Sequence, residues 1–210
     1  MSARTARKPA EQKTPAARLT FHPVTPAQWD DFCELFGPRG ACAGCWCMWW
    51  RLPRPDFRAG KGTGNRAAMR KLVHAGVVPG ILAYRGGRPV AWCSVAPRQE
   101  FPALDRSRVF ARVDASPVWS ISCFFVSREA RRSGITVKLI EAAAAYARRK
   151  GAWIIEGYPV VPTAAGTADA FAFTGLASSF RKAGFTEAAR RSERSAVYRR
   201  TLAPARAPRG

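Results

Sequence analysis

A basic turn between a predicted strand and a predicted helix holds the residues with the clearest chemistry. The segment from Phe125 to Thr136 (FVSREARRSGIT) passes from an apolar stretch, through three arginines, into a helical pattern that opens near Gly134. The first turn of a helix presents unpaired backbone N–H groups and partial positive charge, so it binds anions. Arg131 and Arg132 add charge, and Thr136 adds a hydroxyl donor. This pattern predicts a site for a phosphate-bearing ligand; the alternative is an ordinary loop with solvated arginines.

A second group of reactive side chains lies in the run from Cys42 to Cys47 (CAGCWC). A Cys-x-x-Cys pair is one half of a zinc-ribbon pattern. No second pair follows, so a fourth ligand would have to be Cys33, Cys93 or Cys123. A redox-active pair is the other alternative, and we expect neither it nor a metal. Because the chain has no secretion signal, thiols are the expected state of its cysteines.

Hydrophobic periodicity predicts the elements that would position these residues. In chain order they are a strand at 19–24, a helix capped by Thr25 and ending before Gly37, a helix at 65–74, a hairpin of strands 81–84 and 89–96, a strand at 118–126, a helix at 134–150, a strand at 152–155, a helix at 169–182, and strands at 185–189 and 196–200. Strict alternation along the strand at 118–126 would place on one face Trp119, Ile121, Cys123 and Phe125.

The turn resembles the acetyl-CoA signature of the GNAT N-acetyltransferase family, in which a strand valine precedes an Arg/Gln-x-x-Gly-x-Gly/Ala turn. Val126, Arg131 and Gly134 match, while Thr136 stands where the family has a small residue. The order of predicted elements resembles that family over roughly residues 18–200, and Ala183-Gly-Phe resembles its helix exit. The resemblance implies an α/β fold with a mixed, mostly antiparallel sheet of about six to seven strands. About four helices would flank the sheet, and its fourth and fifth strands would splay apart.

The resemblance also implies acetyl-CoA as co-substrate. Backbone groups of the splayed strand would hold the pantetheine arm and the thioester carbonyl; these belong to Phe124, Phe125 and Val126. The N–H of Val126 would stabilise the oxyanion. The turn would bind the pyrophosphate through Arg131, Arg132, Ser133, Gly134, Ile135 and Thr136.

Acetyl transfer to an amine needs a base for the amine, a donor for the oxyanion and a proton for the leaving thiolate. Glu156 is the base candidate, because burial at the end of an apolar strand favours the protonated form of a carboxylate. The alternative is a structural carboxylate that pairs with an arginine or with loop N–H groups. Phe180 replaces the tyrosine that serves many family members as the acid. Tyr158 is our candidate for that role, and a neighbouring serine or water is the alternative.

The resemblance places residues 42–51 beside the acceptor pocket. Trp46 and Trp49 would form an aromatic wall there, with Arg51 as a polar handle. The alternative is that these residues only cover the core. The implied activity transfers an acetyl group to a primary amine of a small molecule or peptide, by direct attack in a ternary complex.

The charge is strongly positive, with 35 Lys and Arg against 14 Asp and Glu, a net +21. Basic arms at 1–17 and 201–210 are predicted to be disordered around a single domain at 18–200. A nucleic-acid-associated basic protein is therefore one alternative function. No basic stripe alternates with stacking aromatic residues, so nucleic acid would not be the main partner. A catalytically degenerate acyl-CoA-binding sensor, suggested by Phe180, is another.

No apolar run reaches the roughly 18 residues of a membrane span. The N-terminus lacks the apolar core of a secretory signal. We therefore expect a cytoplasmic protein with no membrane partner, either a monomer or a homodimer.

Overall fold

The computed structural model describes residues 18–161 and 173–202. Outside these ranges lie the predicted arm at 1–17, most of the predicted tail at 201–210, and the start of the predicted helix at 169–182. Within them, one sheet has the strand order β1-β2-β3-β4-β5-β7-β6. Its strands are β1 (Leu19–Pro23), β2 (Gly80–Arg85), β3 (Arg88–Pro97), β4 (Trp119–Val126), β5 (Ile154–Gly157), β6 (Thr186–Arg190) and β7 (Ala196–Thr201). Every neighbouring pair is antiparallel except β4 and β5, which confirms the predicted mixed sheet.

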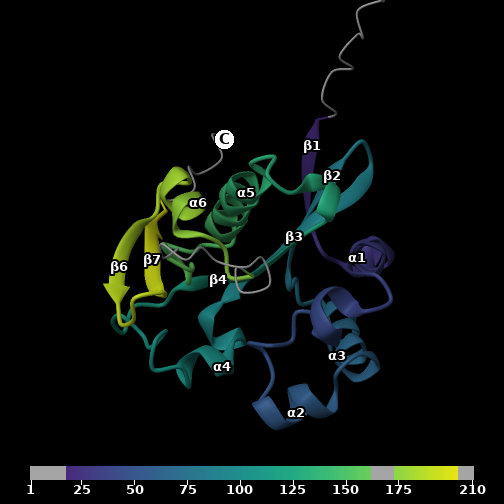
Figure 1. Cartoon of the computed structure of the whole chain (residues 1–210), viewed down its shortest axis with the longest axis horizontal. Coiled ribbons are helices and arrows are strands. Elements are labelled where there is room, and N and C mark those ends of the chain that lie inside the picture. Colours follow the sequence, from purple (N-terminus) through teal and green to yellow (C-terminus); the bar gives the residue numbers. More distant parts are fainter. Residues whose placement is uncertain (1–17, 162–172, 203–210) are drawn as a thin grey trace, which may run out of the picture.

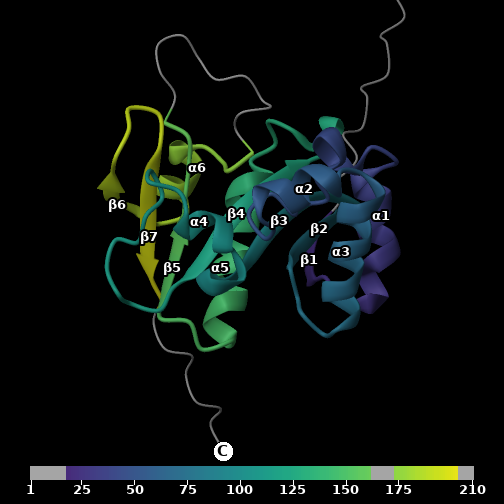
Figure 2. The ribbon, with the colours of Figure 1, turned by 90° about the horizontal axis from the view of Figure 1, so that it is seen from below.

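Helices cover both faces of this sheet (Figures 1 and 2). The helices are α1 (Trp29–Phe36), α2 (Arg54–Ala59), α3 (Thr63–His74), α4 (Pro102–Asp105), α5 (Ile135–Arg149) and α6 (Ala177–Lys182). One buried cluster joins α5 and α6 to the sheet through residues such as Leu139, Ile140 and Phe180. A second, built around Phe32 and Trp92, joins α1 and α3 to the opposite face. The sheet is therefore the middle layer of three.

Several local predictions are confirmed. Thr25 and Gln28 form the expected capping box before α1, which satisfies N–H groups that a helix start leaves unpaired. Gly86 and Gly87 both have positive φ in the turn between β2 and β3, a conformation that glycine adopts without steric cost. The strand β7 extends to Thr201, and Leu202 is buried, so order continues two residues beyond the predicted boundary.

A bulge in β4 makes the prediction of strict alternation wrong. In the ladder with β3, Cys123 lies opposite Ser94 while Ile121 lies opposite Val95, so Ser122 is an extra residue on β4. A bulge shifts the side-chain pattern and bends the strand. Ile121 therefore packs on the α5 side, whereas Cys123 and Phe125 pack on the α1 side.

The bulge also coincides with the splay between β4 and β5. These strands pair only from Trp119 to Ile121 on β4, against Ile155 to Gly157 on β5. From Ser122 onward β4 has no β5 partner among the described residues. The predicted splay is confirmed.

Other boundaries differ from the prediction. The helix predicted at 169–182 begins at Ala177 in the described part, and residues 173–176 are not helical. The fifth strand is shifted, so Glu156 lies within β5 instead of after it. The short helices α2 and α4 were not predicted; each spans at most six residues, too few for a helical period to be visible. None of the described helices has the length and apolarity needed to cross a membrane.

Candidate active site

The turn between β4 and α5 presents a run of free backbone donors. None of the five N–H groups from Arg132 to Thr136 donates to an acceptor in the described part of the chain. Residues 131–134 are exposed, and Arg132 and Gly134 both have left-handed φ, 59° and 76°. Successive N–H groups in such a turn form a concave nest for anions. The turn therefore has the backbone geometry predicted for a phosphate site.

Gly134 is the cap residue of α5, and the space above it is open. A Cβ at this position would have no heavy atom within 4 Å. The left-handed φ of 76° would strain any other residue. A ligand can thus approach the backbone closely at Gly134.

The structure adds Arg85 to the turn, a residue that the sequence did not single out. Its guanidinium, at the end of β2, donates to the Ser133 hydroxyl at 3.1 Å. That hydroxyl in turn donates to the Ala130 carbonyl at 2.6 Å. The side chain of Ser133 thus holds the turn, while its N–H has no acceptor in the described part of the chain. Arg85 and Ser133 are 48 residues apart and meet only in the folded sheet. The sequence near the turn therefore gave no indication that Arg85 belongs to this site.

Alternate N–H groups of β4 point into the splay. Ser127 donates to the Val90 carbonyl of β3 at 2.9 Å, whereas Phe124 donates away from β3 to the Phe173 carbonyl at 2.6 Å. Because donors alternate between the two sides of a strand, Val126 also directs its N–H into the splay. Phe124 and Val126 are two of the three residues predicted to hold the coenzyme thioester and pantetheine. The N–H of the third, Phe125, lies on the β3 side of the strand.

A short described segment, residues 173–176, lies along the open side of β4. Besides the contact with Phe124, the Gly175 carbonyl accepts from Val160 at 2.8 Å, and the Val160 carbonyl accepts from Ala177 at 3.0 Å. A Cβ on Gly175 would meet the rings of Phe124 and Phe180 at 2.9 Å. The Phe173 carbonyl therefore accepts the hydrogen bond of the Phe124 N–H, one of the backbone groups that the coenzyme was predicted to use.

Phe180 is fully buried against Phe124 and Phe185, with ring centroids 6.0 and 5.2 Å away. A phenyl ring has no proton to give. Phe180, which stands where many family members have an acid tyrosine, therefore packs in the core of this chain.

Glu156, on β5, and Tyr158, one residue after the strand, are hydrogen-bonded to each other in a buried network. The Tyr158 hydroxyl donates to one oxygen of Glu156 at 3.0 Å. Arg98 donates to the same oxygen at 3.3 Å and to the tyrosine oxygen at 2.9 Å. Arg199 donates to the other carboxylate oxygen at 2.6 Å, so both oxygens of Glu156 carry charge-assisted bonds.

The electrostatics of this network keep Tyr158 neutral. Burial, and then the charge of Glu156, raise the pKa of Tyr158 well above its usual value, although Arg98 and Ser120 act in the opposite direction. Ser120 lies 2.7 Å from the tyrosine oxygen. Glu156 is 1% exposed and Tyr158 is 0% exposed, so an acceptor reaches them only if the overlying residues move.

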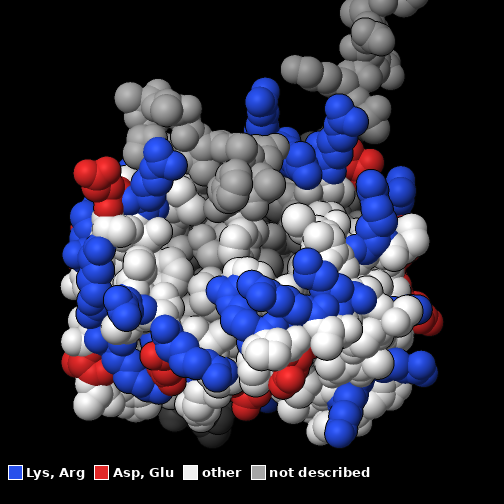
Figure 3. All heavy atoms as spheres, turned by 60° about the horizontal axis from the view of Figure 1, so that its bottom comes forward, with Lys and Arg blue, Asp and Glu red and all other residues white. Residues whose placement is uncertain are grey.

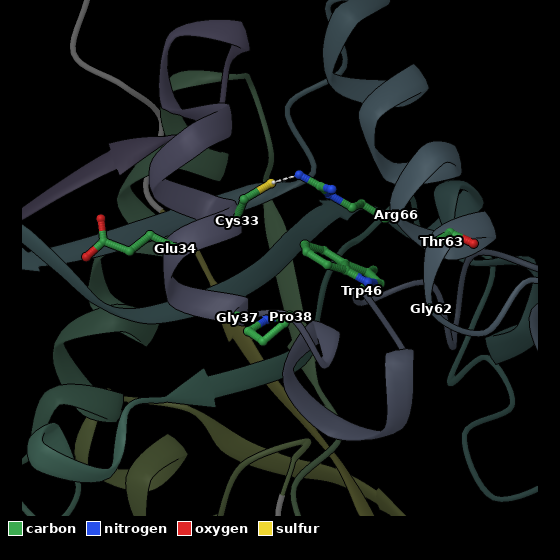
Figure 4. Close-up of a pocket in the computed structure, with 8 residues that line it drawn as sticks. All are labelled: Cys33, Glu34, Gly37, Pro38, Trp46, Gly62, Thr63 and Arg66. Carbon is green, nitrogen blue, oxygen red and sulfur yellow. Dashed lines mark hydrogen bonds between the residues drawn. The ribbon is translucent and has the colours of Figure 1, made fainter.

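Trp46 lines a cavity of about 420 Å³ between α1 and α3 (Figure 4). Arg66 lies over the Trp46 ring and donates to the Cys33 sulfur at 3.5 Å. Trp46 stacks on Phe36, which contacts Phe125 of β4. One of the three predicted acceptor residues thus borders a cavity that two ring contacts connect to β4.

The other two predicted acceptor residues lie elsewhere. Trp49 is partly buried, with the guanidinium of Arg54 3.3 Å from its ring centroid. Arg51 is 7% exposed and donates to the Pro79 carbonyl at 3.2 Å. A second cavity, of about 260 Å³, lies nearby and is lined by Trp50, Arg54, Ala103, Arg106 and Ser107.

The cysteines are free thiols. Among residues 18–161 and 173–202, no three side chains of His, Cys, Asp or Glu are arranged to bind a metal ion. The zinc alternative for the run from Cys42 to Cys47 therefore finds no ligand set in the described chain.

The acetyltransferase (GNAT) family matches residues 46–160, more than half of the chain. This match includes β4, the splay and the turn into α5. The chain belongs to the GNAT acetyltransferase family and is an acyltransferase. No curated protein sequence matches it.

Solved structures share its fold. An N-acetyltransferase from Staphylococcus aureus Mu50 has a TM-score of 0.53 at 12% identity, over 89% of this chain and 100% of that one. A GNAT family acetyltransferase from Listeria monocytogenes 4b F2365 has a TM-score of 0.53 at 10% identity, over 88% and 95%. One from Streptococcus agalactiae 2603 has 0.52 at 10% identity, over 87% and 95%. At these identities the likeness concerns the fold.

Proposed function

We propose that this chain is an acetyl-CoA-dependent N-acetyltransferase that acts on a primary amine of a small molecule or peptide. Family membership supports acetyl transfer. The observation that carries the coenzyme assignment is the run of unpaired N–H groups from Arg132 to Thr136 at the start of α5. Free donors at a helix start, beside exposed arginines, suit a diphosphate.

The coenzyme would lie along the open side of β4. Its diphosphate binds the amides of the turn, with Arg131, Arg132 and Arg85 supplying positive charge. Its pantetheine arm runs into the splay, where the N–H groups of Phe124 and Val126 point. The Phe173 carbonyl holds one of these donors in this structure. When the coenzyme binds, its thioester carbonyl or one of its amide carbonyls replaces the Phe173 carbonyl as the hydrogen-bond acceptor.

The reaction is a direct displacement at the thioester carbonyl carbon. The amine nitrogen forms the new C–N bond, the C–S bond breaks, and the coenzyme leaves as a thiolate that takes a proton from water. Negative charge on the carbonyl oxygen of the tetrahedral intermediate is stabilised by the N–H of Val126. Both substrates are bound together, so no acetyl-enzyme forms.

Glu156 and Tyr158 are the proposed proton-transfer groups. Because Tyr158 is hydrogen-bonded to the base candidate Glu156, we assign it a relay role in place of the acid role expected from the sequence, and water is the acid. The proton of the amine passes to the Tyr158 oxygen, while the hydroxyl proton of Tyr158 passes to Glu156 across their 3.0 Å hydrogen bond. The amine takes the place of the Ser120 hydroxyl, which lies 2.7 Å from Tyr158. Since both groups are buried, acceptor binding must open a path to them.

The acceptor would bind on the side of the sheet that carries α1, α2 and α3. The cavity beside Trp46 offers an aromatic wall with an arginine, and Trp49 and Arg51 follow on the same segment. Basic side chains form a band across the face where α2 and α4 lie, with fewer acidic ones among them (Figure 3). This surface suits acceptors that carry negative charge.

Calorimetric titration with acetyl-CoA, followed by a panel of amines with release of free coenzyme as readout, tests the proposal. A ternary-complex mechanism gives intersecting lines in double-reciprocal plots, whereas an acetyl-enzyme gives parallel lines. Binding without turnover on any amine would favour the sensor alternative. The nucleic-acid-associated alternative predicts salt-sensitive binding of nucleic acid. That binding would survive loss of coenzyme binding and would be lost when the basic arms are removed.

A further inference from the structure

The cavity of about 260 Å³ lies between α2 and α4, and we refer to it as the α2–α4 cavity. Its lining residues are Trp50, Arg54, Ala103, Arg106 and Ser107. Among the described residues, no carboxylate lines it. Its two sides are held together, because the Ala103 N–H donates to the Trp50 carbonyl at 3.1 Å. A preformed cavity whose only charged groups are cations attracts anions.

The two guanidinium groups of this cavity have no counter-charge. Within the described chain, neither Arg54 nor Arg106 forms an ion pair. Asp105, the carboxylate next to Arg106 in sequence, has both oxygens engaged. Arg98 binds one of them at 3.0 Å, and Arg112 binds the other at 3.1 Å. The two lining arginines therefore remain available to an external anion.

The other polar groups of the cavity are also donors. The Ser107 oxygen accepts the Phe110 N–H at 3.2 Å, which leaves its own hydrogen free to donate. Trp50 is 7% exposed, and its covered indole N–H has no acceptor in the described part of the chain. A buried donor without an acceptor costs free energy. A ligand oxygen beside this ring can supply that acceptor once the ring turns.

One of the arginines is held in place by an aromatic ring. The Arg54 guanidinium lies 3.3 Å from the centroid of the Trp49 ring. Such stacking fixes the plane of a guanidinium and leaves its N–H groups free for acceptors at its edge. A planar cation that is fixed in this way loses little conformational freedom when it binds an oxyanion.

A single ring separates the α2–α4 cavity from the proposed proton relay. The Trp50 ring contacts Phe110 with centroids 5.8 Å apart, and Phe110 contacts Tyr158 with centroids 5.2 Å apart. All three rings belong to one buried cluster. A molecule that places one end in the cavity therefore brings its other end close to Tyr158 if the Phe110 ring moves aside.

We propose that the α2–α4 cavity binds an oxyanion group of the acceptor amine, either a carboxylate or a phosphate, through Arg54, Arg106 and Ser107. This inference rests on the proposed function, because it names the class of acceptor: an amine that carries a separate anionic group. The chain that joins the two groups passes Phe110. Displacement of this ring opens the path that the buried Tyr158 requires.

The size of the cavity favours one end of a small molecule. Pockets that enclose a whole drug-sized ligand have volumes of about 300–1,000 Å³, and this cavity is smaller. It suits a single oxyanion with the first atoms of the chain attached to it. The amine end then lies outside the cavity, on the side of Phe110.

The first experiment compares acceptors that differ only in charge, at saturating acetyl-CoA. Alkylamines are paired with ω-amino carboxylates and with ω-aminoalkyl phosphates over a series of matched chain lengths. At the best length we expect kcat/KM to be at least about tenfold higher for the anionic amine, through a lower KM. The carboxylate and phosphate arms show which oxyanion fits better. Equal or lower values for the anionic amines at every length would overturn the proposal.

Matched arginine variants locate the effect. Arg106→Gln removes a cation that lines the cavity, whereas Arg108→Gln removes an exposed cation of the same segment that does not line it. The ratio of kcat/KM between anionic and neutral amines should fall about tenfold in Arg106→Gln and stay within about twofold of wild type in Arg108→Gln. An equal fall in both variants would overturn the proposal, because general surface charge would then explain the preference.

A binding measurement separates failure of this inference from failure of the proposed function. Inorganic phosphate and acetate are titrated into the full chain, and the NMR signal of the Trp50 indole N–H, assigned with Trp50→Phe, is the readout. Phosphate bound at the turn before α5 would leave this signal in place. We expect phosphate to shift it in wild type and in Arg108→Gln, and only at severalfold higher concentration in Arg106→Gln.

That result would support the oxyanion site even if no amine were acetylated, and the proposed function alone would then have failed. A signal that phosphate and acetate both leave unchanged, or that shifts equally in the two arginine variants, would overturn the oxyanion site. Titration with acetyl-CoA in the same samples reports on the coenzyme site independently.

Discussion

The backbone N–H of Phe124 donates to the Phe173 carbonyl at 2.6 Å, inside the gap where β4 and β5 part. A strand edge that faces a gap must pair its donors with something. Here residues 173–176 supply the acceptor. This contact shows that β4 offers an amide to a carbonyl at the point where the proposed thioester would bind.

Coenzyme binding should therefore loosen the segment that now covers Phe124. Val160 and Ala177 are hydrogen-bonded through this segment, so displacing it should speed amide exchange at both. Hydrogen exchange with and without acetyl-CoA, resolved to single residues, measures this. Slower exchange at both amides in the presence of bound coenzyme would show that the segment stays in place.

Arg85 should strengthen coenzyme binding through charge at the turn. The substitution Arg85→Gln removes the donor to Ser133 and a positive charge near the diphosphate. A charge-assisted contact of this kind contributes about 1–2 kcal/mol, so Kd for acetyl-CoA should rise roughly tenfold. The control is Arg88→Gln, which lies opposite Arg85 in the same hairpin. Equal effects of the two variants would mean that only general surface charge matters.

Glu156→Gln should affect both stability and turnover. It removes the carboxylate that Arg98 and Arg199 bind, and breaking a buried ion pair costs about 3–5 kcal/mol. Urea denaturation measures this loss. At a temperature where the variant is folded, kcat should fall while the Kd for acetyl-CoA stays near the wild-type value.

The variant Tyr158→Phe tests the same relay with the ring retained. It should lower kcat and cost about 1–3 kcal/mol, because Glu156 and Arg98 lose a buried partner. Wild-type rates in folded Glu156→Gln and Tyr158→Phe across the pH range would assign both residues to structure alone.

Lowering the pH should weaken the ion pair between Asp105 and Arg98. Burial raises the pKa of Asp105, but Arg98 and Arg112 hold it below its ordinary value. A carboxyl whose folded pKa is depressed stabilises the fold above the unfolded pKa, near 3.9, and loses that effect as pH falls through the folded pKa. Asp105→Asn should therefore lower Tm at about pH 7, with the difference from wild type shrinking below about pH 4. Thermal melts with exposed Asp56→Asn as control measure this, and a pH-independent difference would contradict the ion-pair assignment.

The turn could be predicted from sequence because its signals are local. A glycine in left-handed backbone, the arginines and the start of a helical period all fall within twelve residues, and the structure places the free N–H groups there. The succession of the strands along the chain was predicted from hydrophobic periodicity, whereas their order in the sheet was not. These features depend on neighbours in sequence, which a single chain displays directly.

The surroundings of Glu156 could not be predicted in the same way. Its partners Arg98 and Arg199 come from other elements, 58 and 43 residues away. The bulge at Ser122 adds one residue to β4. Nothing in the composition of the strand marks the bulge, so the sequence did not show that later side chains change face. The contact between Phe124 and Phe173 likewise depends on two segments that meet only in the folded chain.

Titration of two glycine variants with acetyl-CoA tests the central claim most directly. Gly134 and Gly151 begin and end the α5 region, both have left-handed φ, and a Cβ at either position would meet nothing within 4 Å. The strain of Gly134→Glu and of Gly151→Glu is therefore matched, and only the first places a carboxylate among the proposed diphosphate donors. We predict that Gly134→Glu lowers acetyl-CoA affinity at least about a hundredfold while Gly151→Glu binds within about threefold of wild type. Equal affinity in the two variants would contradict the coenzyme site.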